Sequence, residues 1–396
     1  MTRASSALSA VLLWSLPALA GDPAAVRAEV QATLEAMSRA VLAADSEGFL
    51  RHIAGDDALF LTEQRHWAEQ LRDFKPAEFA LSIGAGESAF EADTARFPLV
   101  MSWLITTGPT ESWGAGGKPR SVDFPAVTFI RRDGEWMYQG ETWKKIVGKG
   151  GGFEVWFQPG EKAEAVALDV LKAFPVARDH DNEFFGVQPP PQVLKLFTSM
   201  DHLKATVYLN MPDTYLGGWS EPGESIKFMI SYASGVESWT NAYAHEYGHV
   251  CTWTLGPHAS DMPWWMQEGA AELAAGKFRP GYRERLDADI RRQAVAGSLP
   301  PWDQIANYIT TPQKYKRLAY TQGDHLLNYV THTWGDAARN AWLRAMAADG
   351  KTLDEATRSA LGLPFADLDR RWRDEVKTPA TAPDPVAHPG DKGDTP

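Results

Sequence analysis

The chain has 396 residues, of which 44% are hydrophobic and 16 are tryptophan, enough apolar material for more than one core. Two domains are therefore expected. The formal net charge of −12 argues against nucleic acid as a partner. The single cysteine, Cys251, excludes an internal disulfide, and its apolar neighbours predict a buried, unreactive thiol.

The first twenty residues have the pattern of a cleavable signal peptide. Arg3 supplies the positive start, Val11–Leu16 the apolar centre, and Ala18-Leu-Ala20 a small-x-small cleavage site. This apolar run is too short for a comfortable membrane span, and no later stretch is long and apolar enough. The sequence therefore predicts an exported protein, periplasmic or secreted, without a transmembrane segment.

Residues 21–147 are predicted to form an α+β domain. Apolar residues at helical spacing run from Val26 to Val41. Strands are expected at Phe79–Ile83, Phe97–Thr106 and Ser121–Arg131, with a tight hairpin at Asp133-Gly134. A helix followed by a curved antiparallel sheet resembles the cone fold named after nuclear transport factor 2. The resemblance implies an accessory module that either holds a small ligand or mediates an interaction.

The glycine-rich residues 148–152 are predicted to be a flexible linker, with a second domain at 153–376 and a disordered tail at 377–396. The second domain begins with short strands and then becomes helical. Its expected early elements are strands at Glu154–Phe157, Val193–Phe197 and Thr206–Leu209 and a helix at Ala163–Phe174. Residues 226–232 are either an edge strand beside the active site or an internal strand.

The chemistry concentrates in the stretch His245-Glu246-Tyr-Gly-His249. Two histidines four residues apart lie one turn apart on the same face of a helix, so both imidazoles can reach one Zn²⁺. Glu246 beside them can act as the general base on a zinc-bound water. Glu268 follows nineteen residues after His249, a helix-loop-helix distance that can return a carboxylate to the same metal. Three protein ligands with an open fourth position are typical of a catalytic zinc.

The pair of motifs, HEYGH followed by W-x-x-E-G-x-x-E, resembles the gluzincin metallopeptidases, and most closely the bacterial MA-like peptidases. The resemblance implies one zinc per chain held by His245, His249 and Glu268, and it implies that Glu272 orients a zinc-bound histidine. The metzincin pattern fails, because Thr252 and Leu255 stand where its glycine and third histidine belong.

A second resemblance concerns Tyr320-Thr-Gln-Gly323, which is similar to the Tyr-x-x-Gly helix of the aminopeptidase branch. It implies that the Tyr320 hydroxyl stabilises the oxyanion of the tetrahedral intermediate. Tyr308 and Tyr315 are alternatives for this role, and a core aromatic is the structural alternative. Two histidines close to these motifs, His258 and His325, are not expected to be ligands.

The combined interpretation is an exported zinc peptidase that cleaves peptide or protein substrates. The exopeptidase motif G-x-M-E-N is missing from the sequence, which favours endopeptidase action. Two alternatives stay open: a catalytically silent zinc-containing binding module, and a zinc hydrolase acting on a non-peptide amide or ester. A peptidase needs an open cleft with a strand edge, whereas an enzyme of small substrates needs a closed pocket. The sequence leaves the oligomeric state open.

Overall fold

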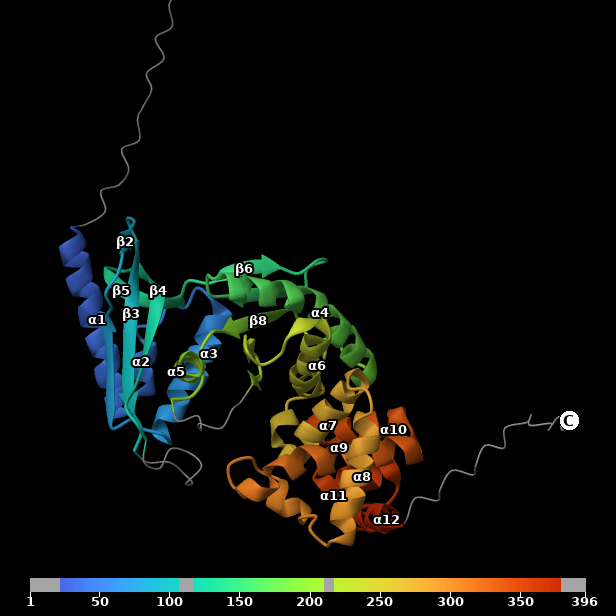
Figure 1. The fold of residues 1–396 in the computed structure, drawn as a ribbon. Helices are drawn as coiled ribbons and strands as arrows, with labels where there is room; N and C mark the ends of the chain where they lie inside the picture. Colours follow the sequence, from blue (N-terminus) through green and yellow to red (C-terminus); the bar gives the residue numbers. More distant parts are fainter. Residues whose placement is uncertain (1–21, 107–116, 210–216, 379–396) are drawn as a thin grey trace, which may run out of the picture. The chain divides into compact units, whose positions relative to one another are not determined.

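The computed structural model describes residues 22–106, 117–209 and 217–378. The chain forms two compact units, one of residues 1–144 and 197–215 (unit 1) and one of residues 145–196 and 216–396 (unit 2). Figure 1 shows their elements coloured along the sequence. The predicted signal peptide and all but two residues of the predicted tail lie outside the described residues.

Unit 1 packs a long helix, α1 (Pro23–Ala43), against an antiparallel sheet. The buried side chains of α1 recur at helical spacing, as the sequence predicts, and the Asp22 side chain caps its first turn. The sheet has the order β1-β3-β4-β5 with β2 paired to β3. The bounds of the remaining elements are α2 (Ser46–Leu50), α3 (Ala58–Glu69), η1 (Gln70–Arg72), β1 (Glu78–Ile83), β2 (Ala89–Phe90), β3 (Thr94–Leu104), β4 (Arg120–Arg132) and β5 (Glu135–Glu141).

The hairpin between β4 and β5 is confirmed at Asp133-Gly134. Both residues have positive φ, 51° and 89°, as a tight two-residue turn of the primed type requires. Register shifts between Phe97 and Leu99 and between Thr128 and Phe129 mark irregularities of the kind that bend a sheet. The α+β prediction therefore holds for this unit.

A short helix from later in the chain, α5 (Met200–Thr206), also belongs to unit 1. The Trp67 indole donates to the Ala205 carbonyl at 3.1 Å, and His202 Nε2 lies 2.7 Å from a Glu141 carboxylate oxygen, both side chains buried. A strand was expected at Thr206–Leu209. This prediction is wrong, because Ser199 caps a helix that ends at Thr206 and buries Ala205 in this core.

Unit 2 begins with a five-stranded sheet of order β6-β7-β8-β10-β9. Its bounds are β6 (Lys144–Val147), β7 (Phe153–Phe157), β8 (Gln192–Phe197), β9 (Gly218–Trp219) and β10 (Ile226–Met229). The glycine-rich segment 148–152 lies between β6 and β7, two neighbouring strands of this sheet, and Gly150, Gly151 and Gly152 have positive φ. This segment therefore forms the loop of a strand pair. Strand β10 is therefore internal, and β9 is one of the two edge strands of the sheet, with β6 at the opposite edge.

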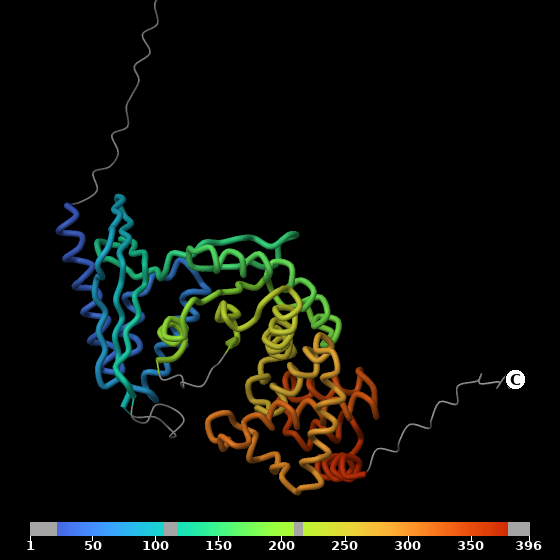
Figure 2. The backbone as a smooth tube through the Cα atoms, viewed as in Figure 1, coloured from blue at the N-terminus to red at the C-terminus, as the bar shows by residue number. Residues whose placement is uncertain are grey.

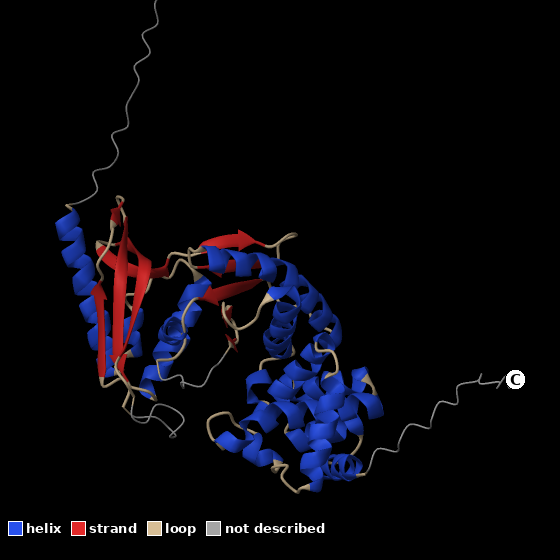
Figure 3. Ribbon diagram, in the orientation of Figure 1, coloured by secondary structure: helices blue, strands red, loops and turns tan. Residues whose placement is uncertain are grey.

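The rest of unit 2 is helical, as the secondary-structure colouring of Figure 3 shows. The helix between β7 and β8, α4, was expected to end at Phe174 but continues through Pro175 to Phe185. Its second half is held in the core by the buried side chains of Ala177 and Phe185. The bounds are α4 (Glu161–Phe185), α6 (Gly235–Thr254), η2 (Ala259–Asp261), α7 (Trp264–Ala275), η3 (Gly276–Phe278), α8 (Tyr282–Val295), η4 (Trp302–Ile305), η5 (Gln313–Tyr315), α9 (Lys316–Trp334), α10 (Asp336–Ala347), α11 (Leu353–Leu361) and α12 (Phe365–Lys377).

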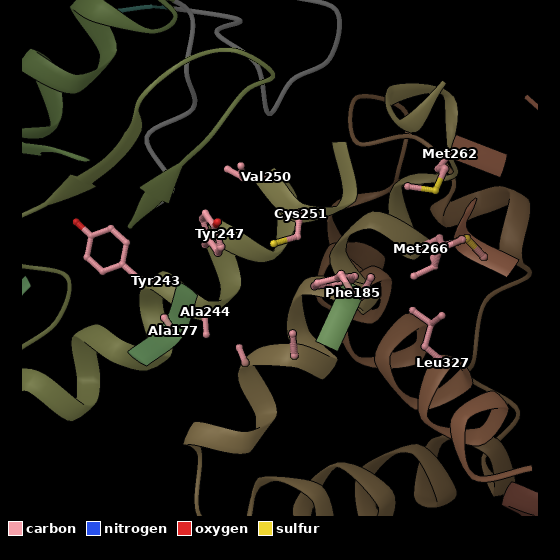
Figure 4. Close-up of a cluster of buried hydrophobic side chains, with 14 of the residues drawn as sticks. Ala177, Phe185, Tyr243, Ala244, Tyr247, Val250, Cys251, Met262, Met266 and Leu327 are labelled. Carbon is pink, nitrogen blue, oxygen red and sulfur yellow. The ribbon is translucent and has the colours of Figure 1, made fainter. Parts of the chain in front are cut away.

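The core of unit 2 holds α6 against α4 on one side and α7 on the other. Figure 4 shows part of this core, with Tyr247 and Cys251 of α6 beside Ala177 and Phe185 of α4. The Tyr247 hydroxyl donates to Asn182 Oδ1 at 3.0 Å, which ties the two helices together. Cys251 is fully buried, and burial raises the pKa of its thiol, so it is an inert core residue.

Three glycines let α6, α7 and α9 approach closely. A Cβ added to Gly248 of α6 would lie 3.0 Å from the Cα of Ala271 in α7. A Cβ on Gly269 of α7 would lie 2.4 Å from the carbonyl carbon of Gly323 in α9, and one on Gly323 would lie 2.0 Å from the Trp265 carbonyl oxygen. Backbone therefore meets backbone at these crossings.

Among the described residues, no helix combines the length and the apolar character needed to cross a membrane. Figure 2 shows the path of the chain in Figure 1 as a smooth tube through the Cα atoms.

Candidate metal centre

Two helices of unit 2 bring three potential ligand atoms together. His245 and His249 lie one turn apart on α6, and Glu268 lies on α7. Each histidine Nε2 is 3.4 Å from Glu268 Oε2, and the three groups can place their ligand atoms within 4.8 Å of one another. Within the described parts of the chain, these residues form the one cluster with the residue types and spacing of a metal site.

The surroundings of Glu268 and His245 leave one potential ligand atom of each facing the centre of the cluster. The Trp264 indole donates to Glu268 Oε1 at 2.7 Å, which leaves Oε2 facing the histidines. That oxygen is buried and accepts no hydrogen bond from the described residues. His245 Nδ1 lies 3.0 Å from Glu272 Oε1, so its Nε2 is the nitrogen left for a metal. Two imidazole nitrogens and one carboxylate oxygen converge on one point, and this donor set fits catalytic zinc.

The ionisable groups of the cluster stabilise one another. Burial acts to raise the pKa of Glu268, but His249 and His245 outweigh it and lower that pKa to about 2. Burial acts to lower the pKa of His245, but Glu268 and Glu272 outweigh it and raise that pKa well above 6.5. Protons therefore compete with a metal for His245, as expected of histidine ligands.

Glu246 and its neighbours face an open pocket of ≈ 210 Å³. The Ser220 hydroxyl donates to Glu246 Oε2 at 2.8 Å. A Cβ on Gly218 of β9 would lie 2.5 Å from Glu246 Oε1 and 2.5 Å from a ring carbon of Phe228, so a larger residue here would displace one or both of these side chains. The pocket is lined by Gly218, Trp219, Ser220, Glu221, His245, Glu246, His249, Trp253, Trp264, Gln267, Glu268, Tyr308 and Tyr320.

Tyr320 lies on α9 and lines the same pocket. Its ring stacks on His245 with centroids 5.9 Å apart and meets the edge of Trp264 at 5.6 Å. Burial and then the charge of Glu268 raise its pKa well above 10, so its hydroxyl stays a donor. Of the two alternatives, Tyr308 also lines the pocket, and Tyr315 is not among the described lining residues.

A buried polar network that the sequence reasoning missed surrounds Glu272. The guanidinium of Arg279 donates to both Glu272 carboxylate oxygens, and the Tyr282 hydroxyl lies 3.1 Å from one of them. The Tyr282 hydroxyl is also 2.9 Å from Asp324 on α9, which accepts from Arg283 at 2.8 Å. These residues follow no recognised motif, and only the three-dimensional packing brings them together.

Neither His258 nor His325 belongs to the cluster, as the sequence predicts. His325 Nδ1 accepts from the Trp372 indole at 3.0 Å, and its Nε2 is 3.3 Å from Asp287. His258 is half exposed, with Nδ1 3.2 Å from Asp261. Both side chains are thus held by local partners.

A comparison with protein families finds a match in one part of the chain. Residues 185–378, just under half of the sequence, match the family model described as the Peptidase MA superfamily. The matched range includes residues 197–209, which the fold places in unit 1. No curated protein matches the chain.

Solved structures show only loose similarity. The M1 zinc metallopeptidase from Deinococcus radiodurans matches with a TM-score of 0.37 and 14% identity over 76% of this chain and 64% of that one. A point mutant of the same enzyme matches with a TM-score of 0.37 and 14% identity over 78% and 66%. The chain thus spans just under two thirds of the length of these structures, and the overlap carries no argument about function. The family match supports a metallopeptidase in residues 185–378.

Proposed function

We propose that this chain is an exported zinc-dependent peptidase that acts as an endopeptidase. The observation that carries the proposal is the convergence of His245, His249 and Glu268 within 4.8 Å, in a pocket that Glu246 and Tyr320 also line. The cleft opens to solvent beside β9, one of the two edge strands of its sheet. An extended peptide can add to such an edge, whereas a small substrate needs no strand.

The proposed chemistry assigns one task to each side chain. Zinc in this site supplies a Lewis acid that polarises the scissile carbonyl and acidifies a water. Glu246, held by Ser220, accepts the proton of the attacking water and delivers it to the leaving amine. The Tyr320 hydroxyl donates to the oxyanion. Glu272 fixes the ring of His245 through Nδ1.

Three further proposals concern the rest of the chain. Residues 1–20 direct export to the periplasm or the medium, on the strength of their signal-peptide pattern. Unit 1 is a cone of the kind named after nuclear transport factor 2, a proposal supported by its long helix on an antiparallel sheet. The chain holds one zinc ion, supported by the single ligand cluster in the described residues.

The test combines elemental analysis with a general peptidase assay on the same samples. The expected result is about one zinc per chain and cleavage that a chelator abolishes. Glu268→Ala should weaken zinc binding. Glu246→Gln should keep zinc but lose roughly 10²–10⁴-fold in kcat, because a general base contributes about that much. Absence of zinc from the purified protein would refute the proposal.

Two other results of this test would favour one of the two alternative functions. Zinc without cleavage of any peptide favours a silent binding module. Chelator-sensitive hydrolysis of small amides or esters, without peptide cleavage, favours the non-peptide hydrolase. Glu284→Gln on α8 is a suitable control, because Glu284 is an acidic residue outside the ligand cluster and the pocket lining.

A further inference from the structure

Arg279 directly follows η3, and its guanidinium group contacts residues of both α6 and α7. Two of its nitrogens donate to the two Glu272 oxygens. Its Nε donates to Asn241 Oδ1 on α6. Since Asn241 precedes His245 by four residues, both lie on the same face of that helix.

The contacts of Glu272 leave its carboxylate little freedom. One oxygen, Oε1, lies 3.0 Å from His245 Nδ1. The other oxygen, Oε2, accepts a hydrogen bond from Arg279 and lies 3.1 Å from the Tyr282 hydroxyl. Because a planar guanidinium fork matches a carboxylate in one geometry, Arg279 sets the plane of the Glu272 carboxylate. That plane in turn decides whether Oε1 faces the imidazole.

The network extends to the helix that carries Tyr320. Asp324 lies one turn after Tyr320, is fully buried, and accepts from Arg283 while facing Tyr282. The single proton of the Tyr282 hydroxyl cannot serve two ionised carboxylates at once. The Tyr282 hydroxyl therefore links Glu272 on α7 to Asp324 on α9 through one shared proton.

We propose that Arg279 is a positioning residue of the metal centre, which acts on the metal through Glu272 and His245 without touching the metal itself. It holds Glu272 so that His245 donates from Nδ1 and presents Nε2 to zinc. It also ties Glu272 on α7 to Asn241 on α6, so the helices that supply the ligands keep their spacing. The inference rests on the zinc site of the proposed function.

The experiment is a double-mutant cycle on zinc affinity. Arg279→Met, Glu272→Gln and the double variant are compared by titrating zinc against a chromophoric chelator at constant pH. Each single change should weaken zinc binding about 10–100-fold, the usual effect of losing a residue that orients a metal ligand. The double variant should lose little more than either single variant, because Arg279 acts through Glu272. Arg279→Lys should recover only part of the affinity.

A control and a second readout separate positioning from general stabilisation. Arg292→Met removes an arginine of α8 that is paired with Asp289 near the surface, and it should leave zinc affinity unchanged. Zinc affinity of the Arg279→Met protein within twofold of wild type, or fully additive losses in the cycle, would overturn the inference. Because this readout needs no peptidase activity, a wild-type protein that binds zinc but cleaves no peptide refutes the proposed function alone.

Discussion

Replacing Gly323 by alanine tests whether the close crossing of α7 and α9 positions the catalytic groups. The new Cβ would lie 2.0 Å from the Trp265 carbonyl oxygen. An ordinary carbon–oxygen contact is about 3.3 Å, so the helices must separate by roughly 1 Å. The nearest atoms, the Trp265 carbonyl oxygen and the Gly269 Cα, belong to the backbone of α7, so no side chain can move aside to make room.

The magnitude follows from two opposing effects. Over-packing a well-packed contact costs about 1–3 kcal/mol, and here the rigid backbone favours the upper end. Alanine recovers up to about 1 kcal/mol of helix propensity, which leaves a net loss near 2 kcal/mol in the free energy of unfolding. Because Tyr320 lies on α9 and Glu268 on α7, a 1 Å separation should also reduce kcat/KM about 100-fold.

The assay is denaturant unfolding with saturating zinc, together with kcat/KM on the folded, zinc-loaded protein. Gly55→Ala is the control, because the nearest atom to its added Cβ is 4.0 Å away and its φ is not positive. A Gly323→Ala protein with wild-type stability and wild-type activity would refute the argument from helix spacing.

Three other predictions concern the pocket and the core. Tyr320→Phe should lower kcat about 10²–10³-fold with little change in zinc content, whereas Tyr308→Phe should have a small effect; the reverse order would make Tyr308 the oxyanion donor. Ser220→Ala removes the hydrogen bond to Glu246 and should lower kcat about tenfold without changing zinc affinity, as steady-state kinetics and zinc titration can show. Asp181 is buried without a hydrogen bond from the described residues, and burial raises the pKa of its carboxyl group well above 3.8. The folded protein therefore holds this proton more tightly than the unfolded chain, and the wild type loses stability as the pH rises above 3.8. The Asp181→Asn variant should flatten this pH dependence of the free energy of unfolding.

Features that depend on local chain chemistry were predictable from the sequence. The Asp133-Gly134 turn requires positive φ at both positions, and few residue pairs tolerate it. The helix α11 begins with a capping box between Thr352 and Glu355 and ends at Gly362 in the left-handed conformation. The convergence of His245, His249 and Glu268 also followed from spacing on two helices.

Features that depend on packing across the fold were not predictable. The apolar run Val207-Tyr208-Leu209 has strand character, but α5 before it docks in the core of unit 1. The Ala205 side chain is buried there and its carbonyl accepts from the Trp67 indole, a distant contact that no local pattern encodes. The edge strand β9 has two residues, too few for any periodicity. Arg279 and Asp324 are ordinary charged residues in the sequence, and their roles arise only from their contacts with Glu272 and Tyr282.

The glycines of the motifs explain why ligand spacing alone does not define this site. Gly248 lies between His245 and His249 and lets α6 approach Ala271 of α7. Gly269 directly follows the ligand Glu268, and Gly323 follows Tyr320 by three residues; these two glycines meet at the crossing of α7 and α9. Under the proposed function, a variant with His245, His249 and Glu268 intact but a larger residue at 323 should still bind zinc, while Tyr320 would lie too far from the substrate carbonyl. The small residues therefore set the distances between helices that the ligands and the tyrosine require.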